Sequence, residues 1–222
     1  MSQDVNVEYA RLRAAGAAGW GGAAATRRRD GWMQTLAWLR RHADFPPPPA
    51  HLLELGCGNG LVSALFAEQG YRVEGIEQSG DAVAWAHAAF EARGLAGTFR
   101  RGDVRAMPAC SDGCFDAVID GNCLHCLIGC DRAACLAEVR RVTKADGVFV
   151  VSTMCGEPKS ATARARFDPA ARCLMEDGKP TRALLEAAAI VAEVEVAGFR
   201  VVSQHVRPNS WWDHLTLLAV VA

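Results

Sequence analysis

Apolar runs alternate with helical segments between residues 51 and 154, and this alternation constrains the fold more than any other feature of the sequence. Such runs are typical of strands that are buried on both faces of a sheet. The segments between them have helical character, and two of them end at a glycine. The expected strands are residues 51–57, 71–78, 97–103, 115–121 and 147–154, and the expected helices are residues 61–70, 81–94 and 131–143. The pattern predicts a mostly parallel sheet with helices on both sides.

The C-terminal part of the chain departs from this simple alternation. Residues 181–198 are expected to form a helix that ends at Gly198, and two strands follow at residues 199–207 and 214–222. The six residues between these strands are too few for the crossover that parallel pairing needs, which takes about a dozen residues or more. We therefore expect the two strands to be antiparallel, either directly or through an intervening neighbour.

The N-terminal part is expected to form a helical cap over residues 1–45, set off from the core by four consecutive prolines. Those prolines lie within residues 45–50, where they cannot continue a helix and favour a stiff, extended connector. The length suits one substantial domain. We expect a single domain over residues 1–222, with residues 50–222 as its α/β core.

Composition is that of an ordinary globular protein, since half of the residues are apolar and 22% are charged. The formal net charge of −1 gives no overall attraction to nucleic acid or to an anionic membrane, so we expect neither partner. Charged residues near the start, Asp4, Glu8 and Arg11 among them, stand where a secretory leader needs an apolar core. We expect a cytoplasmic protein, monomeric or homodimeric, with its nine cysteines reduced.

The sequence LLELGCGNG, residues 52–60, places glycines at the turn from the first expected strand to the first expected helix. Gly56, Gly58 and Gly60 allow the backbone to turn sharply and to approach a ligand closely. In open parallel sheets, ligands bind just beyond the carboxyl ends of the strands. A dinucleotide fingerprint would be G-x-G-x-x-G, whereas this loop is G-x-G-x-G and is followed by Leu61. The loop therefore predicts a ligand site and weakens the case for NAD.

Two acidic residues follow the next expected strands. Glu77 ends the second strand, where a carboxylate can accept hydrogen bonds from both ribose hydroxyls. Asp103 ends the third strand, where a polar group can reach an adenine amino group. The alternative role of each acid is to cap a helix or to stabilise a turn.

Taken together, these motifs resemble those of the class I S-adenosylmethionine-dependent methyltransferases. The resemblance covers about residues 50–222 and is specific as a set, although each motif by itself is weak. It is carried by LLELGCGNG, by Glu77 after VEGI, by GDV at 102–104, by FDAVID at 115–120 and by VRRVTKADGVFVVST at 139–153.

The resemblance implies a Rossmann-like α/β fold with a seven-stranded, mostly parallel sheet in the order 3-2-1-4-5-7-6, whose last strand is antiparallel. It also implies S-adenosyl-L-methionine as cofactor and S-adenosyl-L-homocysteine as product. The glycine loop would cradle the methionine part, Glu77 would hold the ribose, and Asp103 with Val104 would hold the adenine. The residues expected to contact the cofactor are Glu54, Gly56, Cys57, Gly58, Gly60, Glu77, Gln78, Asp103, Val104, Asp120, Gly121 and Asn122.

The same resemblance implies an enzyme that transfers a methyl group directly to a small molecule by in-line displacement. Holding donor and acceptor aligned and dry can lower the barrier by several kcal/mol. Some acceptors must also lose a proton. His125, in the loop after the fourth expected strand, is our candidate general base because histidine titrates near neutral pH. Its alternative role is purely structural.

The acceptor pocket is expected to come from segments outside these motifs. Trp20, Trp211 and Trp212 are the candidate substrate contacts, and the turn of residues 19–22 could close over the cofactor. The insertion of residues 155–181 and its end carry four arginines that hint at an anionic acceptor, namely Arg164, Arg166, Arg172 and Arg182. Ordinary packing and solvated charge are the alternative for each of these residues.

Three other functions remain open. The segment GNCLHCLIGC, residues 121–130, could bind zinc or an iron–sulfur cluster through Cys123, Cys126 and Cys130, or the protein could methylate a soft element such as arsenic, selenium or tellurium. The segment lacks a second knuckle with zinc-ribbon spacing, so we expect no metal and cysteines that pack as small apolar side chains. The remaining two are a nicotinamide-dependent oxidoreductase and a cofactor-binding protein without catalysis.

Overall fold

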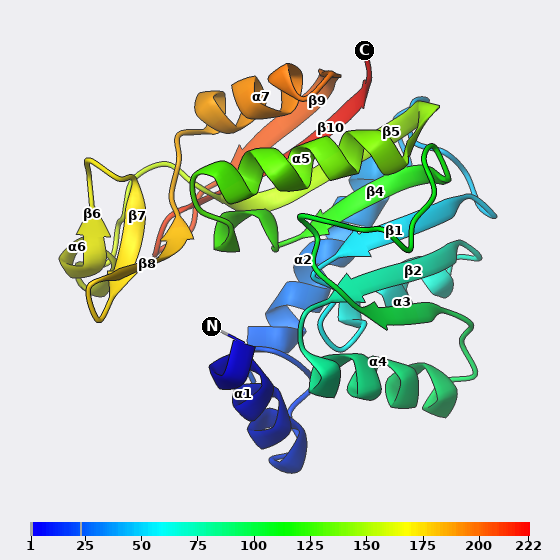
Figure 1. Cartoon of the computed structure of the whole chain (residues 1–222), viewed down its shortest axis with the longest axis horizontal. Coiled ribbons are helices and arrows are strands. Elements are labelled where there is room, and N and C mark those ends of the chain that lie inside the picture. The colour runs from blue at the N-terminus through cyan, green and yellow to red at the C-terminus, as the bar shows by residue number, and fades with distance from the viewer. Residues whose placement is uncertain (1, 23) are drawn as a thin grey trace.

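A seven-stranded sheet forms the middle layer of the computed structural model, which describes residues 2–22 and 24–222 (Figure 1). The strand order is β3-β2-β1-β4-β5-β10-β9. The strands are β1 (His51–Leu55), β2 (Arg72–Glu77), β3 (Thr98–Arg101), β4 (Phe115–Gly121), β5 (Thr143–Cys155), β9 (Phe199–Arg207) and β10 (Asp213–Val221). β10 pairs antiparallel with both β5 and β9, and the other neighbouring pairs are parallel. The predicted sheet order and the antiparallel last strand are confirmed.

The central strand β1 carries apolar side chains on both of its faces. Leu52 packs with the helices on one face, and Leu53 and Leu55 pack with those on the other. Each of the three is at most 2% exposed. Because both faces need cover, such a strand is stable only inside a sheet with helices on either side. β1 accordingly lies between β2 and β4, and its carboxyl end opens at the middle of one sheet edge.

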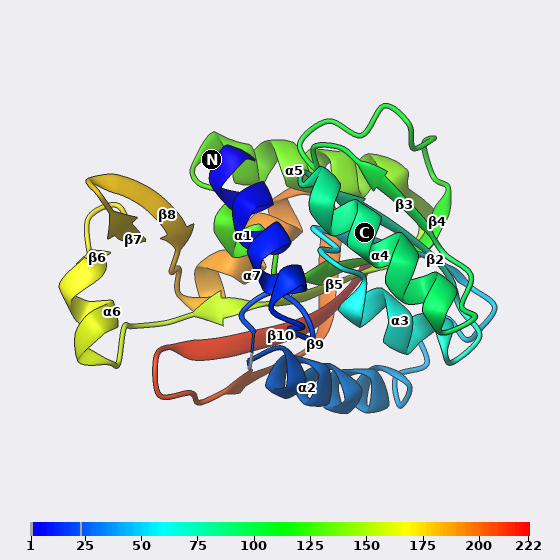
Figure 2. The same ribbon diagram turned by 90° about the horizontal axis from the view of Figure 1, so that it is seen from below.

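Helices cover both faces of the sheet, as the view in Figure 2 shows. One face packs against α2 (Ala24–Leu39), α3 (Leu61–Ala67) and α4 (Gly80–Ala92), and the other packs against α5 (Cys130–Val142) and α7 (Ala187–Val196). The N-terminal helix α1 (Ser2–Ala14) packs against α4. Among the described residues, we find no helix with the length and apolar character that a membrane crossing would need.

The proline segment is a turn rather than the predicted extended connector. The Ala50 N–H donates a hydrogen bond to the Pro47 carbonyl at 3.1 Å, which closes the turn. Phe45, just before the prolines, is buried against the rings of Phe66 and Tyr71. The segment bends because its two ends are held by this packing, which the sequence pattern does not reveal.

The residues between β5 and α7 form a small separate sheet that the sequence did not predict, and it projects to one side of the molecule (Figure 1). It follows α6 (Ala161–Arg166) and contains β6 (Phe167–Asp168), β7 (Cys173–Glu176) and β8 (Lys179–Ala183). The predicted helix over residues 181–198 is therefore wrong at its start, since α7 begins at Ala187. Arg182 pairs with Leu174 of β7, and the Thr181 hydroxyl donates to the Leu174 carbonyl at 3.0 Å. This strand pairing overrides the local helix preference.

We expect Phe149→Ala to lower the free energy of unfolding by about 3–5 kcal/mol, because truncation of a buried phenylalanine leaves a cavity. Phe149 lies on β5, has no exposed surface, and contacts the Phe199 ring at a centroid distance of 5.5 Å. Urea unfolding measures the change. The control is Val196→Ala, at a position 90% exposed on α7, which should change the free energy by less than about 0.5 kcal/mol. Equal effects of the two substitutions would contradict this placement of the core.

Candidate active site

Three neighbouring strands end in acidic residues at the same edge of the sheet. Glu54, Glu77 and Asp120 lie at the carboxyl ends of β1, β2 and β4, and β1 pairs with both of the other strands. Ligand sites in open parallel sheets form at this edge. The structure thus brings together three of the residues that the sequence predicted for a cofactor site.

The glycines in the loop after β1 have left-handed backbone conformations, which other residues rarely adopt. φ is +57° at Gly56, +54° at Gly58 and +75° at Gly60. A Cβ atom on Gly56 would lie 2.9 Å from the Cys123 sulfur, and one on Gly58 would lie 2.6 Å from the Tyr9 hydroxyl oxygen. The loop therefore requires glycine both for its conformation and for the space that its neighbours occupy.

The Glu77 carboxylate is held by backbone N–H groups and forms no ion pair within the described part of the chain. It accepts hydrogen bonds from the Gly58 N–H at 3.1 Å and from the Ser79 N–H at 2.9 Å. Burial raises the pKa of Glu77, and the N–H groups partly oppose this increase. Each carboxylate oxygen can accept a further hydrogen bond. Glu77 therefore fits the pair of hydroxyl groups that a ribose presents.

The Glu54 carboxyl group is enclosed at the end of β1. One oxygen accepts hydrogen bonds from the Ser63 N–H at 2.8 Å and from the Ser63 hydroxyl, which ties β1 to the first turn of α3. The other oxygen lies so close to Gly121 that a Cβ there would be 2.6 Å away. Burial raises the pKa of Glu54 to about 8. The group is therefore mostly protonated at neutral pH.

Asp120 organises the loop after β4. Its Oδ1 atom accepts hydrogen bonds from the N–H groups of Cys123 at 2.6 Å and Leu124 at 2.8 Å. Its Oδ2 atom is buried and has no hydrogen-bond partner among the described residues. Burial raises the pKa of Asp120 to about 6. Buried acceptors are normally paired, so this oxygen is a place where a bound ligand could donate a hydrogen bond.

Asp103 and Val104, the residues predicted to hold an adenine, follow β3, and Gln78, another predicted cofactor contact, follows β2. Val104 is buried, whereas Asp103 and Gln78 are exposed. The Asp103 carboxylate accepts hydrogen bonds from the Arg105 guanidinium at 2.6 and 3.0 Å, and this pairing lowers the pKa of Asp103. An adenine contact would have to share the carboxylate with Arg105.

The N-terminal segment forms the outer wall over the glycine loop. Tyr9 of α1 is buried, and its ring contacts those of Trp20 and Trp85 at centroid distances of 4.8 and 6.4 Å. The Asn59 side chain donates to the Ala18 carbonyl at 3.0 Å. Asn59 was absent from the predicted site, although its place among the loop glycines was a usable signal. The contact from α1 has no such signal in the sequence.

His125 lies in η1 (Leu124–Cys126), a single 3₁₀ turn that follows β4. Its Nδ1 atom is 3.3 Å from the Thr153 hydroxyl oxygen. Burial lowers the pKa of His125 to about 3, and the nearby positive charge of Arg182 contributes to this shift. The imidazole is therefore neutral at neutral pH, so it can accept a proton, but it is a weak base in this environment.

The cysteines after β4 do not all pack as small apolar side chains, contrary to the prediction. Cys123 is partly buried, whereas Cys126 and Cys130 are exposed. Cys130 begins α5 outside the stripe through Cys135 and Val139 that this helix buries, which explains its exposure. Within residues 2–22 and 24–222, no three His, Cys, Asp or Glu side chains are grouped so that they could hold a metal ion.

The three predicted substrate tryptophans lie in two separate parts of the structure. Trp20 contacts Tyr9 at the outer wall of the glycine loop. Trp211 is 46% exposed, and its ring contacts that of Trp212 at a centroid distance of 5.9 Å. Trp212 packs against the apolar cluster that includes Leu174 of the small sheet. Trp212 therefore helps to anchor the insertion to the main sheet.

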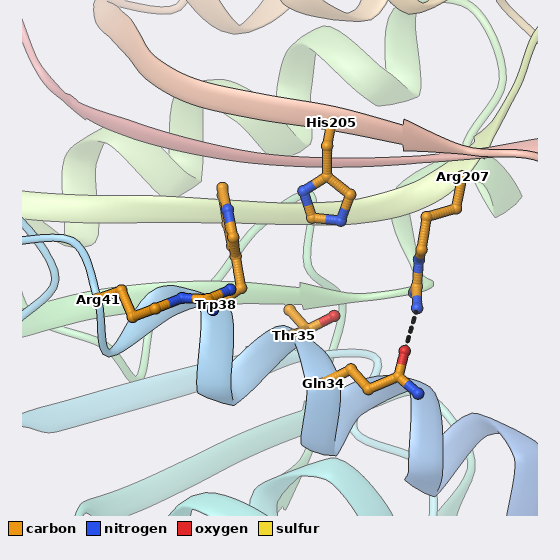
Figure 3. A pocket seen from close by; sticks show the side chains of 6 residues that line it. All are labelled: Gln34, Thr35, Trp38, Arg41, His205 and Arg207. Atoms are coloured by element: carbon orange, nitrogen blue, oxygen red, sulfur yellow. Dashed lines mark hydrogen bonds between the residues drawn. The ribbon is translucent and has the colours of Figure 1, made fainter.

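A separate pocket of about 290 Å³ lies between α2 and β9 (Figure 3). The Arg207 guanidinium donates a hydrogen bond to the Gln34 side chain at 3.1 Å and so connects the helix to the strand. The pocket is lined by Gln34, Thr35, Trp38, Arg41, His205 and Arg207. None of these residues belongs to the predicted site, so the pocket is distinct from the site at the strand ends.

The pKa of Glu54 predicts that stability falls as the pH rises from 6.5 to 8. The folded state retains the Glu54 proton up to about pH 8, whereas the unfolded chain has lost it, so unfolding releases a proton in this range. From this group alone, the free energy of unfolding should fall by about 1–2 kcal/mol over the interval. His125 and His214, whose pKa burial lowers to about 3 and about 4, act in the opposite direction, because the unfolded chain loses its histidine protons near pH 6.5. Each recovers about 0.4 kcal/mol over the interval, which leaves a net fall of about 1 kcal/mol.

Urea unfolding at several pH values measures this slope. We expect Glu54→Gln to remove the fall and leave a flat or slightly rising stability, because an amide keeps the acceptor for Ser63 without titrating while the buried histidines remain. Glu68→Gln, at an exposed position after α3, is the control and should keep the wild-type slope. A slope that survives in Glu54→Gln would show that another group causes the pH dependence.

Comparison with known proteins agrees with this geometry. Residues 53–151 match a family model described as a methyltransferase domain. Over 141 residues, the chain is 32% identical to the malonyl-[acyl-carrier protein] O-methyltransferase of Serratia marcescens, and the alignment covers 62% of this chain and 49% of that protein. The chain spans about half the length of the curated relatives that it matches.

Solved structures share the fold at lower sequence identity. The PH0226 protein of Pyrococcus horikoshii OT3 is 20% identical, with a TM-score of 0.70 over 87% of this chain and 91% of that chain. The 1,6-didemethyltoxoflavin-N1-methyltransferase of Burkholderia thailandensis is also 20% identical, with a TM-score of 0.67 over 98% and 90% of the two chains. The matched family region contains the glycine loop and the ends of β1, β2 and β4. The sequence motifs, the fold and this match together identify residues 53–151 as a methyltransferase domain.

Proposed function

We propose that this protein transfers a methyl group from S-adenosylmethionine to a small molecule by direct in-line displacement. The observation that carries the proposal is the hydrogen bond from the Gly58 N–H to the Glu77 carboxylate, which joins the glycine loop and the predicted ribose contact into one unit. The match of residues 53–151 to a methyltransferase domain supports methyl transfer as the reaction class. The net charge of −1 supports a small molecule rather than nucleic acid as acceptor.

The residues at the strand ends fit this cofactor. The three glycines of the loop from Gly56 to Gly60 leave its backbone without side chains at those positions, so a ligand can approach it closely. Glu77 can accept further hydrogen bonds, and Val104 offers apolar surface. When bound, S-adenosylmethionine supplies a methyl group on a sulfonium that is electrophilic without further activation. Because Tyr9 lies against Gly58, we expect α1 to shift when the cofactor binds, or Tyr9 to form one wall of its site.

In this proposal, the chain positions the acceptor, excludes water and, where the acceptor requires it, removes a proton. His125 is neutral and lies beside the strand ends, so it is the candidate for that last role. Its Nδ1 atom faces the Thr153 hydroxyl, which leaves Nε2 as the nitrogen that accepts a proton. Proton removal by a positioned side chain contributes a rate factor of about 10² to 10⁴.

The relatives do not indicate which kind of atom is methylated here. The Serratia protein is named for O-methylation of malonyl-[acyl-carrier protein], and the Burkholderia protein for N1-methylation of 1,6-didemethyltoxoflavin. Since one methylates oxygen and the other nitrogen, the shared fold does not set the nucleophile. We infer that the acceptor is selected by segments outside the matched residues 53–151, which in this chain include the N-terminal helices and the insertion before α7.

Gly58→Val and Glu77→Ala should each lower the affinity for S-adenosylhomocysteine by at least about tenfold, which isothermal titration calorimetry can measure. Valine at position 58 is strained at a φ of +54° and meets the Tyr9 hydroxyl, while alanine at position 77 removes the carboxylate. Gly178→Val is the matched control, since Gly178 has a φ of +72° and open space around it. Unchanged affinity in both site variants would refute this placement of the cofactor.

Label from S-adenosylmethionine with a tritiated methyl group should appear on at least one member of a panel of small acids, phenols, amines and thiols. For an acceptor that loses a proton, we expect His125→Asn to lower kcat by about 10²-fold or more. His42→Asn, after the end of α2 and in contact with Trp38, is the control. An unchanged kcat in His125→Asn would exclude the base role. Binding of NADH without binding of S-adenosylhomocysteine would overturn the proposed function.

A further inference from the structure

Two arginines near His125 have neither a hydrogen-bond partner for their side chains nor an ion-pair partner among the described residues. Arg28 lies near the start of α2, and Arg182 lies on β8 of the small sheet. Both side chains are partly buried. A guanidinium group has five N–H donors, and when it is removed from bulk water it normally pairs with an acid or with carbonyl groups. The missing partners therefore call for an explanation.

The other arginines of the insertion show that partners were available in this region. Arg172 binds Glu157 and Glu186. Arg166 pairs with Glu176, and Arg164 donates to the Pro158 carbonyl. Of the four arginines that the sequence singled out, Arg182 is the one whose side chain has no partner within the part of the chain that the structure describes. Among the four arginines, Arg182 is therefore the candidate for binding an anionic acceptor.

Arg182 and Arg28 belong to segments far apart in the chain, and both lie near enough to the turn that carries His125 to act on it electrostatically. β8 packs against η1, which places Arg182 beside this turn. Arg28 reaches it from α2, and the two positive charges lie near enough to act on each other, on His125 and on Cys126. Two like charges brought together without a counter-ion repel each other, so the arrangement is unfavourable in the absence of a ligand.

The acids nearby do not neutralise this pair. Glu54 is the carboxyl group that acts on Arg28, but burial raises its pKa to about 8, so it is mostly uncharged at neutral pH. Tyr9 also acts on Arg28, and burial raises its pKa, so it is neutral as well. Asp120 and Glu77 also act on Cys126, but their carboxylates bind backbone N–H groups and neither pairs with Arg28 or Arg182. The two guanidinium groups therefore keep their positive charge near His125 without a bound counter-ion among the described residues. A cationic acceptor would be repelled there, and an anionic one would be attracted.

We propose that Arg28 and Arg182 together bind an anionic group, a carboxylate or a phosphate, on the small-molecule acceptor. The planar fork of a guanidinium group matches the paired oxygens of either anion, and two such groups would fix its orientation. The assignment to the acceptor rests on the proposed methyltransferase function. The inference that an anion binds does not depend on that function, because it follows from the two guanidinium groups that lack partners among the described residues.

Anion binding also has a consequence for His125. Burial is the main cause of the low pKa of His125, and the positive charges of Arg182 and Arg28 add to it. An anion between the two guanidinium groups would offset these charges and so make the imidazole a stronger base. Binding of the anionic acceptor would thereby raise the pKa of His125, the proposed base that removes its proton.

The first test is stability, because a binding role and a structural role predict opposite results. If the two arginines are kept for binding, Arg182→Gln relieves repulsion and should leave the melting temperature unchanged or raise it. If Arg182 instead supports the fold, the substitution should lower the melting temperature by several degrees. Arg172→Gln, which breaks contacts with Glu157 and Glu186, is the matched structural variant and should lower it.

The second test measures binding to protein saturated with S-adenosylhomocysteine, with benzoate, phenyl phosphate and neutral benzamide as probes. At least one anion should bind about tenfold or more tightly than benzamide. Tighter binding of benzoate would indicate a carboxylate site, and tighter binding of phenyl phosphate a phosphate site. Arg28→Gln and Arg182→Gln should each remove about tenfold of that affinity and change S-adenosylhomocysteine affinity less than about threefold. Arg200→Gln, an exposed residue near the start of β9, is the control.

The outcomes separate this inference from the proposed function. If S-adenosylhomocysteine does not bind the wild-type protein, the proposed function fails, and anion binding is then tested without it. If S-adenosylhomocysteine binds but benzamide matches both anions, or none of the three probes binds, the inference is overturned. It is also overturned if the variants at Arg28 and Arg182 bind the anions as well as Arg200→Gln does.

Discussion

Three buried carboxyl groups, each bound by backbone N–H groups of a neighbouring loop, hold the candidate site together. Glu54 binds the first turn of α3, Glu77 binds the glycine loop, and Asp120 binds the loop that leads to His125. Because the three strands are adjacent, the three loops are held at one edge of the sheet. Burial raises the pKa of all three acids, so part of the stability of the fold is given up to position these loops.

Charge is divided between the core and the segments added to it. The sheet supplies the acids at the strand ends, whereas the helical cap and the insertion supply Arg28 and Arg182. In the proposed reaction, the methyl donor carries positive charge and the acceptor carries negative charge. The ionised Asp120 carboxylate at the strand ends and the arginines near the acceptor would match these charges. Charged side chains without partners are expected where a residue is required for binding or catalysis rather than for the stability of the fold.

The two added segments depend on the core for their positions. Tyr9 rests on Gly58, and the Asn59 side chain binds the turn after α1, so the cap is joined to the glycine loop itself. The small sheet is anchored through the apolar cluster of Met154, Leu174 and Leu184, with Trp212 against it. Any change in the glycine loop can therefore reach the cap directly. The insertion is instead linked to the site through the packing of β8 on η1.

The sequence by itself determined the main sheet, because apolar strands, helix-ending glycines and the short gap before residues 214–222 are local signals that leave few topologies. It also located the glycine loop and the acids Glu54, Glu77 and Asp120, since strand ends meet at one edge in any parallel sheet. Only the tertiary structure decided that residues 179–183 form a strand and that Tyr9 covers Gly58. These features join segments that are far apart in the chain, as does the placement of Arg28 and Arg182 near His125. No local sequence pattern encodes such contacts.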